Sequence, residues 1–260
     1  MIGGEPAVDP ALVDEAVDLA RRAGELSLRW FRAPDLRVDR KGDGTPVTDA
    51  DRAVERFLRS SISAAHPDDG IVGEEEEPVE SASGRTWVLD PIDGTKAFTR
   101  GVPLYANLLA VEDSYGCAVG VVNIPALGQM VWAGRGRGCH LNGVPVSVSA
   151  RAELDGAYVS SSGYEAWDED ALLNVKRAGA FLRTWGDGYG YLLVAIGAVD
   201  AMVDPEAARY DLAPMPVILG EAGGAFTDFA GRPTTTGGSA VATNGHLHAS
   251  LLACLAGDPR

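Results

Sequence analysis

The apolar positions in the first quarter of the chain follow two helical patterns separated by a short alternating stretch. From Pro10 to Phe31, apolar residues recur near helical spacing, with acidic residues early and arginines late, which predicts an amphipathic helix. Leu36 to Arg40 alternates like a strand. A second helix is predicted from Thr48 to about Ala65, because Asp51 follows Thr48 at the spacing of an N-terminal cap.

Short apolar runs replace the helical pattern in the middle of the chain. A strand at Gly70–Val72 and another at Trp87–Leu89 flank a polar loop at Pro78–Gly84. The runs that follow predict an antiparallel meander, with Asn142-Gly143 as a hairpin turn. These runs are Tyr105–Glu112, Gly116–Ile124, Gln129–Ala133, Cys139–Leu141 and Val144–Val148.

Strand and helix patterns alternate after residue 157, which favours a parallel or mixed sheet covered on both faces. The predicted strands are Ala157–Ser160, Phe181–Thr184 and Ala201–Val203, and the predicted helices are Glu169–Arg177, Tyr189–Ile196 and Leu212–Ala222. We place the boundary at Ser149–Asp155. It divides the chain into an N-terminal α+β domain, residues 1–150, and a C-terminal α/β domain, residues 151–260, tightly joined to the first.

The composition is that of a soluble globular protein and excludes several classes of function. The 260 residues are 46% hydrophobic and 23% charged, with a net charge of −15, which argues against a nucleic-acid groove lined by Lys and Arg. No run approaches the roughly 20 apolar residues of a membrane helix, and the N-terminus lacks the pattern of a signal peptide. We therefore expect a cytoplasmic protein without a nucleic-acid or membrane partner.

The cysteines and two short motifs are interpreted as structural. The three cysteines are odd in number and widely spaced, which indicates neither a disulfide framework nor a zinc site. His246 and His248 form a His-x-His motif without a third ligand nearby. The Gly134–Gly138 string alternates glycine and arginine like an RNA-binding segment, but it is brief and fits the rim of a hairpin better.

The stretch from Trp87 to Lys96 carries the clearest chemical signal. Asp90 follows three apolar residues and would lie at the end of a buried strand, and Asp93 lies in the turn beyond Pro91. Both carboxylates would then face one small space. Gly94 opens a new element whose backbone N–H groups would suit a phosphate, so the stretch predicts a magnesium and phosphate site, although an ordinary turn remains open as an alternative.

Acidic residues recur in two other segments, which strengthens the prediction. Glu74 directly follows the strand end at Gly73, whereas Glu76 and Glu77 of the same run are interpreted as solvated. Asp211 would open a helix and combine capping with ligation. Hard cations prefer such oxygen ligands, and hydrolysis of a phosphate monoester requires relief of negative charge on the transferred group.

These segments, in this order from about Thr45 to Gly224, resemble the inositol monophosphatase superfamily of magnesium-dependent, lithium-sensitive phosphatases. The resemblance implies a five-layer αβαβα sandwich, a mixed α+β and α/β fold that forms a homodimer. It also implies two or three Mg²⁺ ions per site, with Mn²⁺ able to substitute. The acidic loop would belong to the N-terminal domain.

The resemblance also assigns metal ligands. Glu74, Asp90 and the backbone carbonyl of Ile92 would hold the first ion. Asp90 would bridge to a second ion, completed by Asp93 and Asp211. Tyr210 stands where the family usually has Trp, which affects only the local packing expected around Asp211.

Catalytic and substrate-binding roles follow from the same resemblance. Thr95 and Glu74 would orient the attacking water, and the N–H groups of Gly94 and Thr95 would receive phosphate oxygens. Asp49 would hydrogen-bond Thr95, with a first-turn helix acid as the alternative. Lys41 would lie near the third metal position, with a surface lysine as the alternative. Glu221 would have either a structural role or a role in binding a substrate hydroxyl.

Three further segments look most like actinobacterial histidinol-phosphate phosphatases: Thr184–Tyr191, Val203–Pro205 and Ala240–Gly245. A cationic substrate would be attracted by the carboxylate of Asp187, which on local grounds is equally well interpreted as a helix N-cap. We expect Mg²⁺-dependent conversion of L-histidinol phosphate to L-histidinol and phosphate, a step of histidine biosynthesis. The alternatives are an inositol-1-phosphate or broad sugar or nucleotide monophosphatase, possible in a secondary-metabolite pathway, and a binding protein without turnover.

Overall fold

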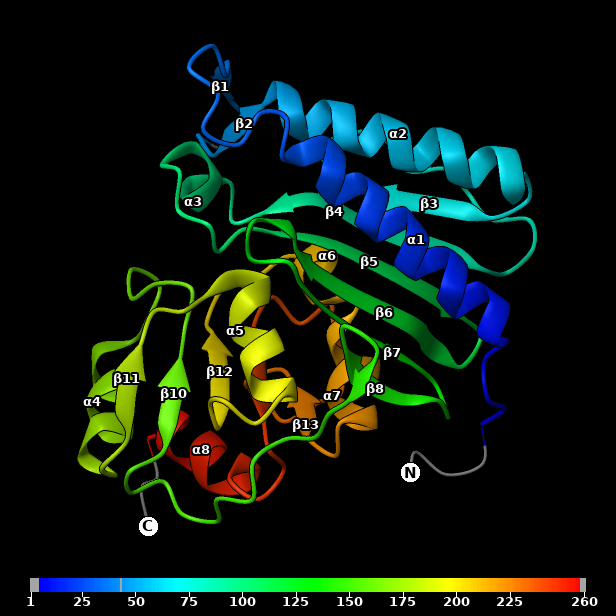
Figure 1. Cartoon of the computed structure of the whole chain (residues 1–260). Helices are drawn as coiled ribbons and strands as arrows, with labels where there is room; N and C mark the ends of the chain where they lie inside the picture. Colours follow the sequence, from blue (N-terminus) through cyan, green and yellow to red (C-terminus); the bar gives the residue numbers. More distant parts are fainter. Residues whose placement is uncertain (1–4, 43, 258–260) are drawn as a thin grey trace.

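Helices and sheets alternate in five layers in the computed structural model, which describes residues 5–42 and 44–257 (Figure 1). Asp43 and the outermost residues of both expected domains, 1–4 and 258–260, lie outside these ranges. Helices α1 (Pro10–Ser27) and α2 (Asp49–Ala65) form the outer layer on one side. Helices α4 (Glu169–Arg177) and α8 (His248–Leu255) form the outer layer on the other side. The expected sandwich architecture is confirmed.

The larger sheet contains seven strands within the described ranges, in the order β3-β4-β5-β6-β7-β8-β9. Their bounds are β3 Gly70–Gly73, β4 Thr86–Asp93, β5 Ala106–Asp113, β6 Gly116–Ile124, β7 Gln129–Gly134, β8 Gly138–Leu141 and β9 Val144–Pro145. All neighbours pair antiparallel except β3 and β4, so the predicted meander is present. A 3₁₀ turn, Pro125–Leu127, links β6 to β7.

The smaller sheet is mixed, as the sequence predicts for this half of the chain. Among the described residues its five strands run in the order β11-β10-β12-β14-β13, with bounds β10 Tyr158–Ser160, β11 Phe181–Arg183, β12 Ala201–Asp204, β13 Ala225–Thr227 and β14 Ala240–Thr243. Strand β10 is parallel to β11 and β12, and β14 is antiparallel to β12 and β13. A separate hairpin joins β1 (Val38–Arg40) to β2 (Pro46–Thr48).

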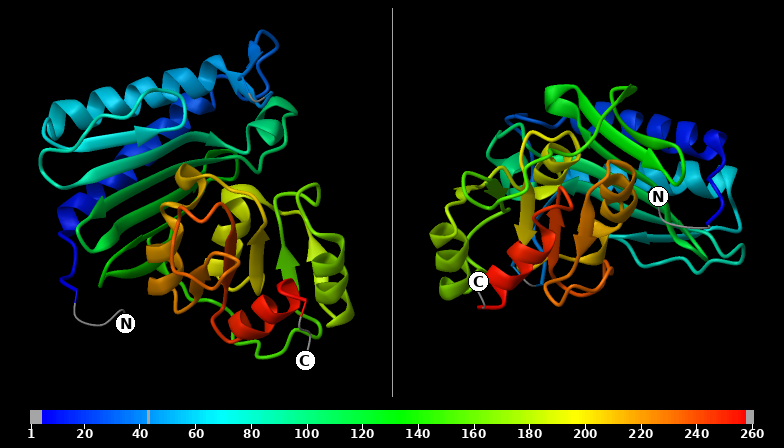
Figure 2. Two further views of the ribbon diagram at one scale, coloured as in Figure 1. Left: turned by 180° about the vertical axis from the view of Figure 1, so that it is seen from behind. Right: turned by 90° about the horizontal axis from the view of Figure 1, so that it is seen from below.

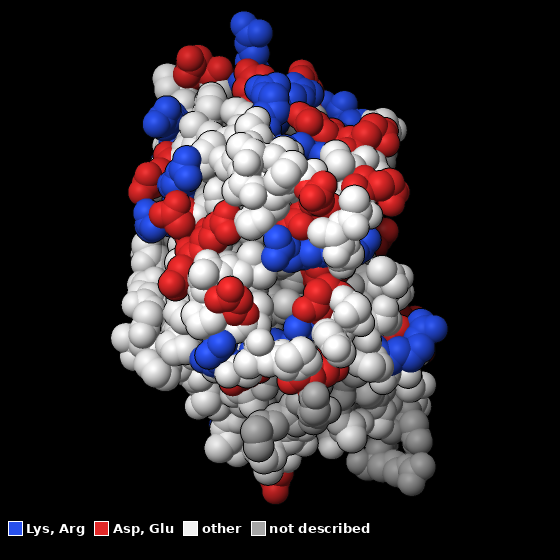
Figure 3. Space-filling model, turned by 90° about the vertical axis from the view of Figure 1, so that its right-hand side faces the viewer, with Lys and Arg blue, Asp and Glu red and all other residues white. Residues whose placement is uncertain are grey.

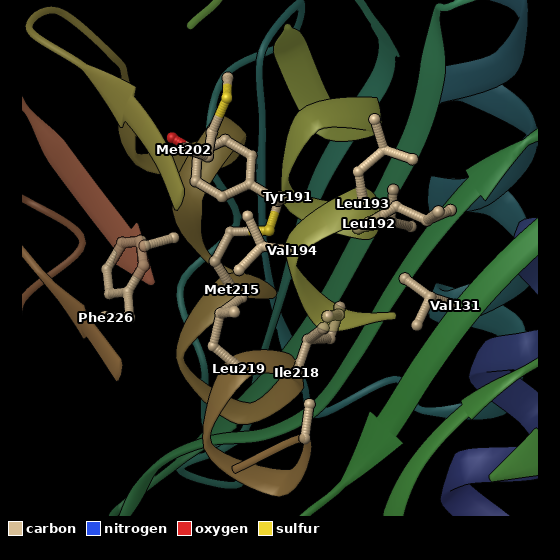
Figure 4. Close-up of a cluster of buried hydrophobic side chains, with 14 of the residues drawn as sticks. Val131, Tyr191, Leu192, Leu193, Val194, Met202, Met215, Ile218, Leu219 and Phe226 are labelled. Atoms are coloured by element: carbon tan, nitrogen blue, oxygen red, sulfur yellow. The ribbon is translucent and has the colours of Figure 1, made fainter. Parts of the chain in front are cut away.

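The middle layer consists of α5 (Asp187–Ala195), α6 (Arg209–Leu212) and α7 (Met215–Glu221), which pack between the two sheets (Figures 1 and 2). Figure 4 shows the resulting core, in which Leu192 and Ile218 from the helices approach Val131 of the larger sheet, while Phe226 belongs to the smaller one. The expected boundary at 149–155 falls between the sheets. The helices of the middle layer pack against both sheets and share a core with them, so the structure does not separate two domains, and the division stays a prediction.

Two local sequence features explain where the outer helices begin. Asp9 accepts the N–H of Ala11 at 3.0 Å and Pro10 occupies the first turn, so α1 starts there. Thr48 and Asp51 form the reciprocal capping box that the sequence predicts for α2. Helix α1 ends at Ser27 rather than at Phe31.

One predicted helix, Leu212–Ala222, is wrong in its extent. The structure has two short helices instead, α6 and α7, because Pro214 lies between them and cannot donate a helical hydrogen bond. The carbonyl of Pro214 approaches the larger sheet so closely that a Cβ at Gly120 of β6 would lie 2.5 Å from it. Glycine at this position therefore allows the start of α7 to pack directly on the strand.

Charged side chains of both signs are interspersed over the face in Figure 3, with uncharged surface between them. None of the helices in the described ranges has the length and apolarity needed to cross a membrane.

Candidate active site

Strand β4 ends in a bulge that turns two carboxylates to the same side. Side chains alternate along a strand, so Asp90 and Asp93 would face opposite sides of a regular one. The pairing with β5 shifts register between these two residues, and the Asn107 amide donates to the carbonyl of Pro91 at 2.6 Å. Asp90 is also fixed by the N–H of Ile92, which it accepts at 3.0 Å.

A third carboxylate reaches the same point from the other half of the chain. Asp211 lies in α6 and accepts the N–H of Ala208 at 2.8 Å, which caps this short helix. One oxygen from each of Asp90, Asp93 and Asp211 lies within 4.8 Å of the other two. The structure thus brings together three of the expected metal ligands.

Asp90 and Asp93 are buried, Asp211 is half-buried, and none of the three has a basic partner among the described residues. Asp90 is 1% exposed and Asp93 9%. Burial, followed by the charges of neighbouring acids, raises the pKa of both well above the usual range, and burial raises the pKa of Asp211 to about 6. Within residues 5–42 and 44–257, none of the three forms an ion pair with Lys or Arg. Three clustered carboxylate oxygens without a cationic partner are suited to bind a hard divalent cation.

Glu74 lines the same pocket but faces a lysine. It follows β3 directly, and its Oε1 accepts from Lys41 Nζ at 2.7 Å. Lys41 also lies 2.7 Å from Glu75 Oε1. Burial lowers the pKa of Lys41, but the hydrogen bonds to both glutamates outweigh it, so the net pKa is raised and the ammonium stays charged. Lys41 is thus more than a surface lysine, since it holds the acidic loop against the β1–β2 hairpin.

The acidic partner of Thr95 is Asp51, which corrects the prediction of Asp49. Thr95 Oγ1 lies 3.5 Å from Asp51 Oδ1 and 3.0 Å from the carbonyl of Ile92. The Asp49 side chain is about half exposed and lies 3.8 Å from Arg52. Asp51 shares the buried face of α2 with Val54, three residues on, a spacing that could have identified it from the sequence.

Gly94 and Asp187 meet across the pocket. Gly94 has φ 77°, a left-handed conformation that favours glycine, and precedes helix α3 (Thr95–Thr99). A Cβ there would lie 2.8 Å from Asp187 Oδ2. Asp187 is the first residue of α5 and Gly186 is its N-cap, so the N-cap interpretation of Asp187 is wrong. Its N–H donates to Ser162 Oγ at 2.9 Å, and burial raises the pKa of its carboxyl to about 6.

A further pocket acid, Asp204, received no role from the sequence. It ends β12, is 4% exposed, and accepts the Tyr191 hydroxyl at 2.7 Å and the N–H of Ser162 at 2.9 Å. Burial raises the pKa of this carboxyl. Its position after an apolar strand matches that of Asp90, and this shared pattern was the available signal.

Glu221 does not line the pocket, so it is not placed to bind a substrate hydroxyl there. Its two oxygens each accept a backbone N–H at 2.7 Å, from Gly136 and Gly138. Glu221 therefore holds the β7–β8 turn, and the structural alternative is the correct one. This turn is the glycine–arginine string, which is indeed the rim of a hairpin.

The pocket encloses about 640 Å³, and more acidic than basic side chains line it. The basic lining residues are Lys96 of α3 and Arg100, the residue that follows this helix; both are exposed, and the sequence did not single them out. The acidic lining residues are Glu74, Asp93, Asp187, Asp204 and Asp211, which are buried or half-buried, and Glu165 and Glu206, which are exposed.

The inositol monophosphatase family model matches residues 9–257. The chain belongs to this family. A histidinol-phosphatase from Mycobacterium tuberculosis is 44% identical over 91% of this chain and 95% of its own length. Another histidinol-phosphatase, from Chlorobaculum parvum, is 40% identical over 94% of this chain and 96% of its own.

A solved structure with the same fold is the extragenic suppressor protein SuhB from Bartonella henselae. It has a TM-score of 0.88 and 27% identity, and the alignment covers 94% of this chain and 98% of that one. As a member of the inositol monophosphatase family, this chain is a phosphatase, and the family is generally Mg²⁺-dependent.

Proposed function

We propose that the chain hydrolyses L-histidinol phosphate to L-histidinol and phosphate in the cytoplasm, as a step of histidine biosynthesis. The observation that carries this proposal is the acidic wall of the pocket, where Asp187 and Asp204 extend the carboxylate cluster beyond the three candidate metal ligands. The two relatives named histidinol-phosphatase support the same substrate.

The residues that would hold Mg²⁺, or Mn²⁺ in its place, are Asp90, Asp93 and Asp211, together with Glu74 and the carbonyl of Ile92. Bound as two or three ions, the metal would relieve negative charge on the phosphoryl group and on the leaving oxygen. The other functions, orienting the water and binding the phosphate oxygens, would be carried out by side chains and backbone groups of the chain.

Thr95 and Glu74 are suited to orient a water molecule. The Thr95 hydroxyl donates toward the carbonyl of Ile92 or the carboxylate of Asp51, which leaves its lone pairs free to accept a hydrogen bond from that water. The N–H groups of Gly94 and Thr95 would bind phosphate oxygens. Glycine at position 94 lets the phosphate approach the backbone closely.

The second part of the pocket is suited to a cation. Histidinol carries an ammonium group and an imidazole. After burial, the charge of Asp204 is the next cause that raises the pKa of the Asp187 carboxyl, so the two carboxylates lie near each other. Asp204 is buried and Asp187 is half-buried, so a cationic group placed beside them would be attracted more strongly than in water. Inositol phosphate and sugar phosphates, the alternative substrates, offer no such charge.

A substrate panel with the variant Asp187→Asn tests this assignment. Asparagine keeps the size and, like aspartate, tolerates the positive φ of 53° at this position, so the variant removes mainly the charge. We expect kcat/KM for histidinol phosphate to fall about tenfold, equivalent to about 1.4 kcal/mol. The value for inositol-1-phosphate should change little. Equal efficiency on both substrates in the native enzyme, unaffected by Asp187→Asn, would contradict the histidinol assignment.

We also propose that the enzyme is a homodimer. An exposed cluster of aromatic side chains at the edge of the smaller sheet supports this, because Tyr158, Phe181 and Trp185 are each more than one-third exposed and Tyr158 contacts both of the others. Arg183 lies over the rings of Tyr158 and Trp185. Such a patch on an edge strand favours association. Light scattering should give the mass of two chains, and Phe181→Asp should give that of one. A single-chain mass for the native protein would refute the dimer.

A further inference from the structure

A buried glutamate outside the pocket holds the loop that carries Glu74. Glu55 lies on α2, and its side chain is fully buried. Its Oε2 accepts the N–H of Glu75 at 2.8 Å, and its Oε1 accepts the N–H of Glu76 at 3.0 Å. One carboxylate therefore fixes two successive peptide units directly after Glu74.

Arg59 completes this anchor one helical turn later. Its Nε donates to Glu55 Oε1 at 2.8 Å, which balances the buried charge. Its two terminal nitrogens donate to the backbone carbonyls of Glu76 at 2.8 Å and Glu77 at 3.1 Å. The pair thus binds both the N–H and the C=O groups of the loop, which leaves its backbone little freedom.

Gly73 allows the carboxylate to come this close. A Cβ at Gly73 would lie 2.2 Å from Glu55 Oε1 and 2.9 Å from an Arg59 nitrogen. The residue immediately before Glu74 therefore packs against the anchor, so the backbone is held on both sides of Glu74.

We infer that Glu55 is a positioning residue that, with Arg59, fixes the backbone of residues 73–77 and so sets the affinity of the Glu74 carboxylate for a divalent cation. The inference rests on the proposed metal site. A carboxylate suits this role because it accepts hydrogen bonds on both oxygens and carries the charge that Arg59 requires. A glutamine of the same size would point an N–H group at one of these donors.

The test compares Glu55→Gln with Asp69→Asn. Asp69 is a matched control, because it is also a buried carboxylate and anchors the opposite end of β3, where it accepts from Arg85, Trp87 and Ser83. Without metal, both variants should have a lower melting temperature than the native protein. Only Glu55→Gln should weaken Mg²⁺ binding, measured calorimetrically without substrate, by about 10–100-fold, as is typical for the loss of a group that supports a ligand.

Activity provides a second measurement. At saturating Mg²⁺ the Glu55→Gln enzyme should regain most of its kcat, whereas a defect that persists at all Mg²⁺ concentrations would overturn a role in metal affinity. Should Glu55→Gln not fold, Arg59→Lys carries the test, because it keeps the charge but loses the paired contacts to the loop carbonyls. Its Mg²⁺ affinity should fall in the same direction by a smaller factor.

The outcomes separate this inference from the proposed function. Unchanged Mg²⁺ affinity in Glu55→Gln, or an equal loss in Asp69→Asn, overturns the positioning role alone. A native protein that binds no Mg²⁺ overturns the metal site together with the inference.

Discussion

Replacing Asp90 with asparagine is expected to remove nearly all phosphatase activity while leaving the metal-free protein at least as stable as the native one. Asp90 lies at the centre of the carboxylate cluster and is almost fully buried. The loss should exceed the roughly 100-fold effect typical of groups that only support a ligand. Because the variant also removes repulsion among three acids, its melting temperature without metal should be equal to or higher than that of the native protein.

The control for this experiment is Asp228→Asn. Asp228 is equally buried, but its partners are the backbone N–H groups of Ala230 and Arg232 and the Arg232 side chain, in a loop that does not line the pocket. It should lose stability and keep kcat/KM. An Asp90→Asn enzyme with native activity would remove Asp90 from the set of metal ligands.

The stability of the metal-free protein is expected to fall as the pH rises, and Mg²⁺ should reverse this loss. The carboxyl groups of Asp51, Asp187 and Asp211 have an ordinary pKa of 3.8, which burial raises to about 6 in the folded state. The folded state therefore binds more protons than the unfolded state between these values. Their contribution to stability is fully present below about pH 4 and is lost as the pH rises through about 6.

Thermal melting between pH 5 and pH 8, with EDTA or with Mg²⁺, measures both effects. Without metal, the melting temperature should decrease across this range. Mg²⁺ at about 100 times its dissociation constant should stabilise the fold by about 2.7 kcal/mol, or about 5–10 °C for a chain of this size. A flat profile without metal, or identical curves with and without Mg²⁺, would contradict a preformed site with raised pKa values.

The amphipathic helices, the meander and the mixed second sheet could be predicted because each depends on local periodicity. The carboxylates of Asp90 and Asp211 could also be predicted as ligands, because the sequence shows Asp90 after an apolar run and Asp211 in the first turn of a helix. The resemblance to the inositol monophosphatase family added their common site, and membership of that family is confirmed.

The residues whose roles were assigned wrongly or not recognised from the sequence have roles that depend on the direction of the side chain or on contacts with distant parts of the chain. Asp49 and Asp51 both stand in the first turn of α2, and only the face of the helix separates the exposed one from the partner of Thr95. Glu221 finds its partners at Gly136 and Gly138, more than 80 residues away in the chain. Glu55 shows no local signal, because its function lies in a loop reached only through the tertiary fold.

The third acid of the cluster comes from α6, a helix that follows the last strand of the first sheet by more than 60 residues. A ribosome must therefore have released most of the polypeptide before the ion-binding centre can exist, so a nascent chain that has completed only the larger sheet would be inert. Recovery of enzyme activity during refolding should consequently report the docking of both halves, rather than the collapse of either one.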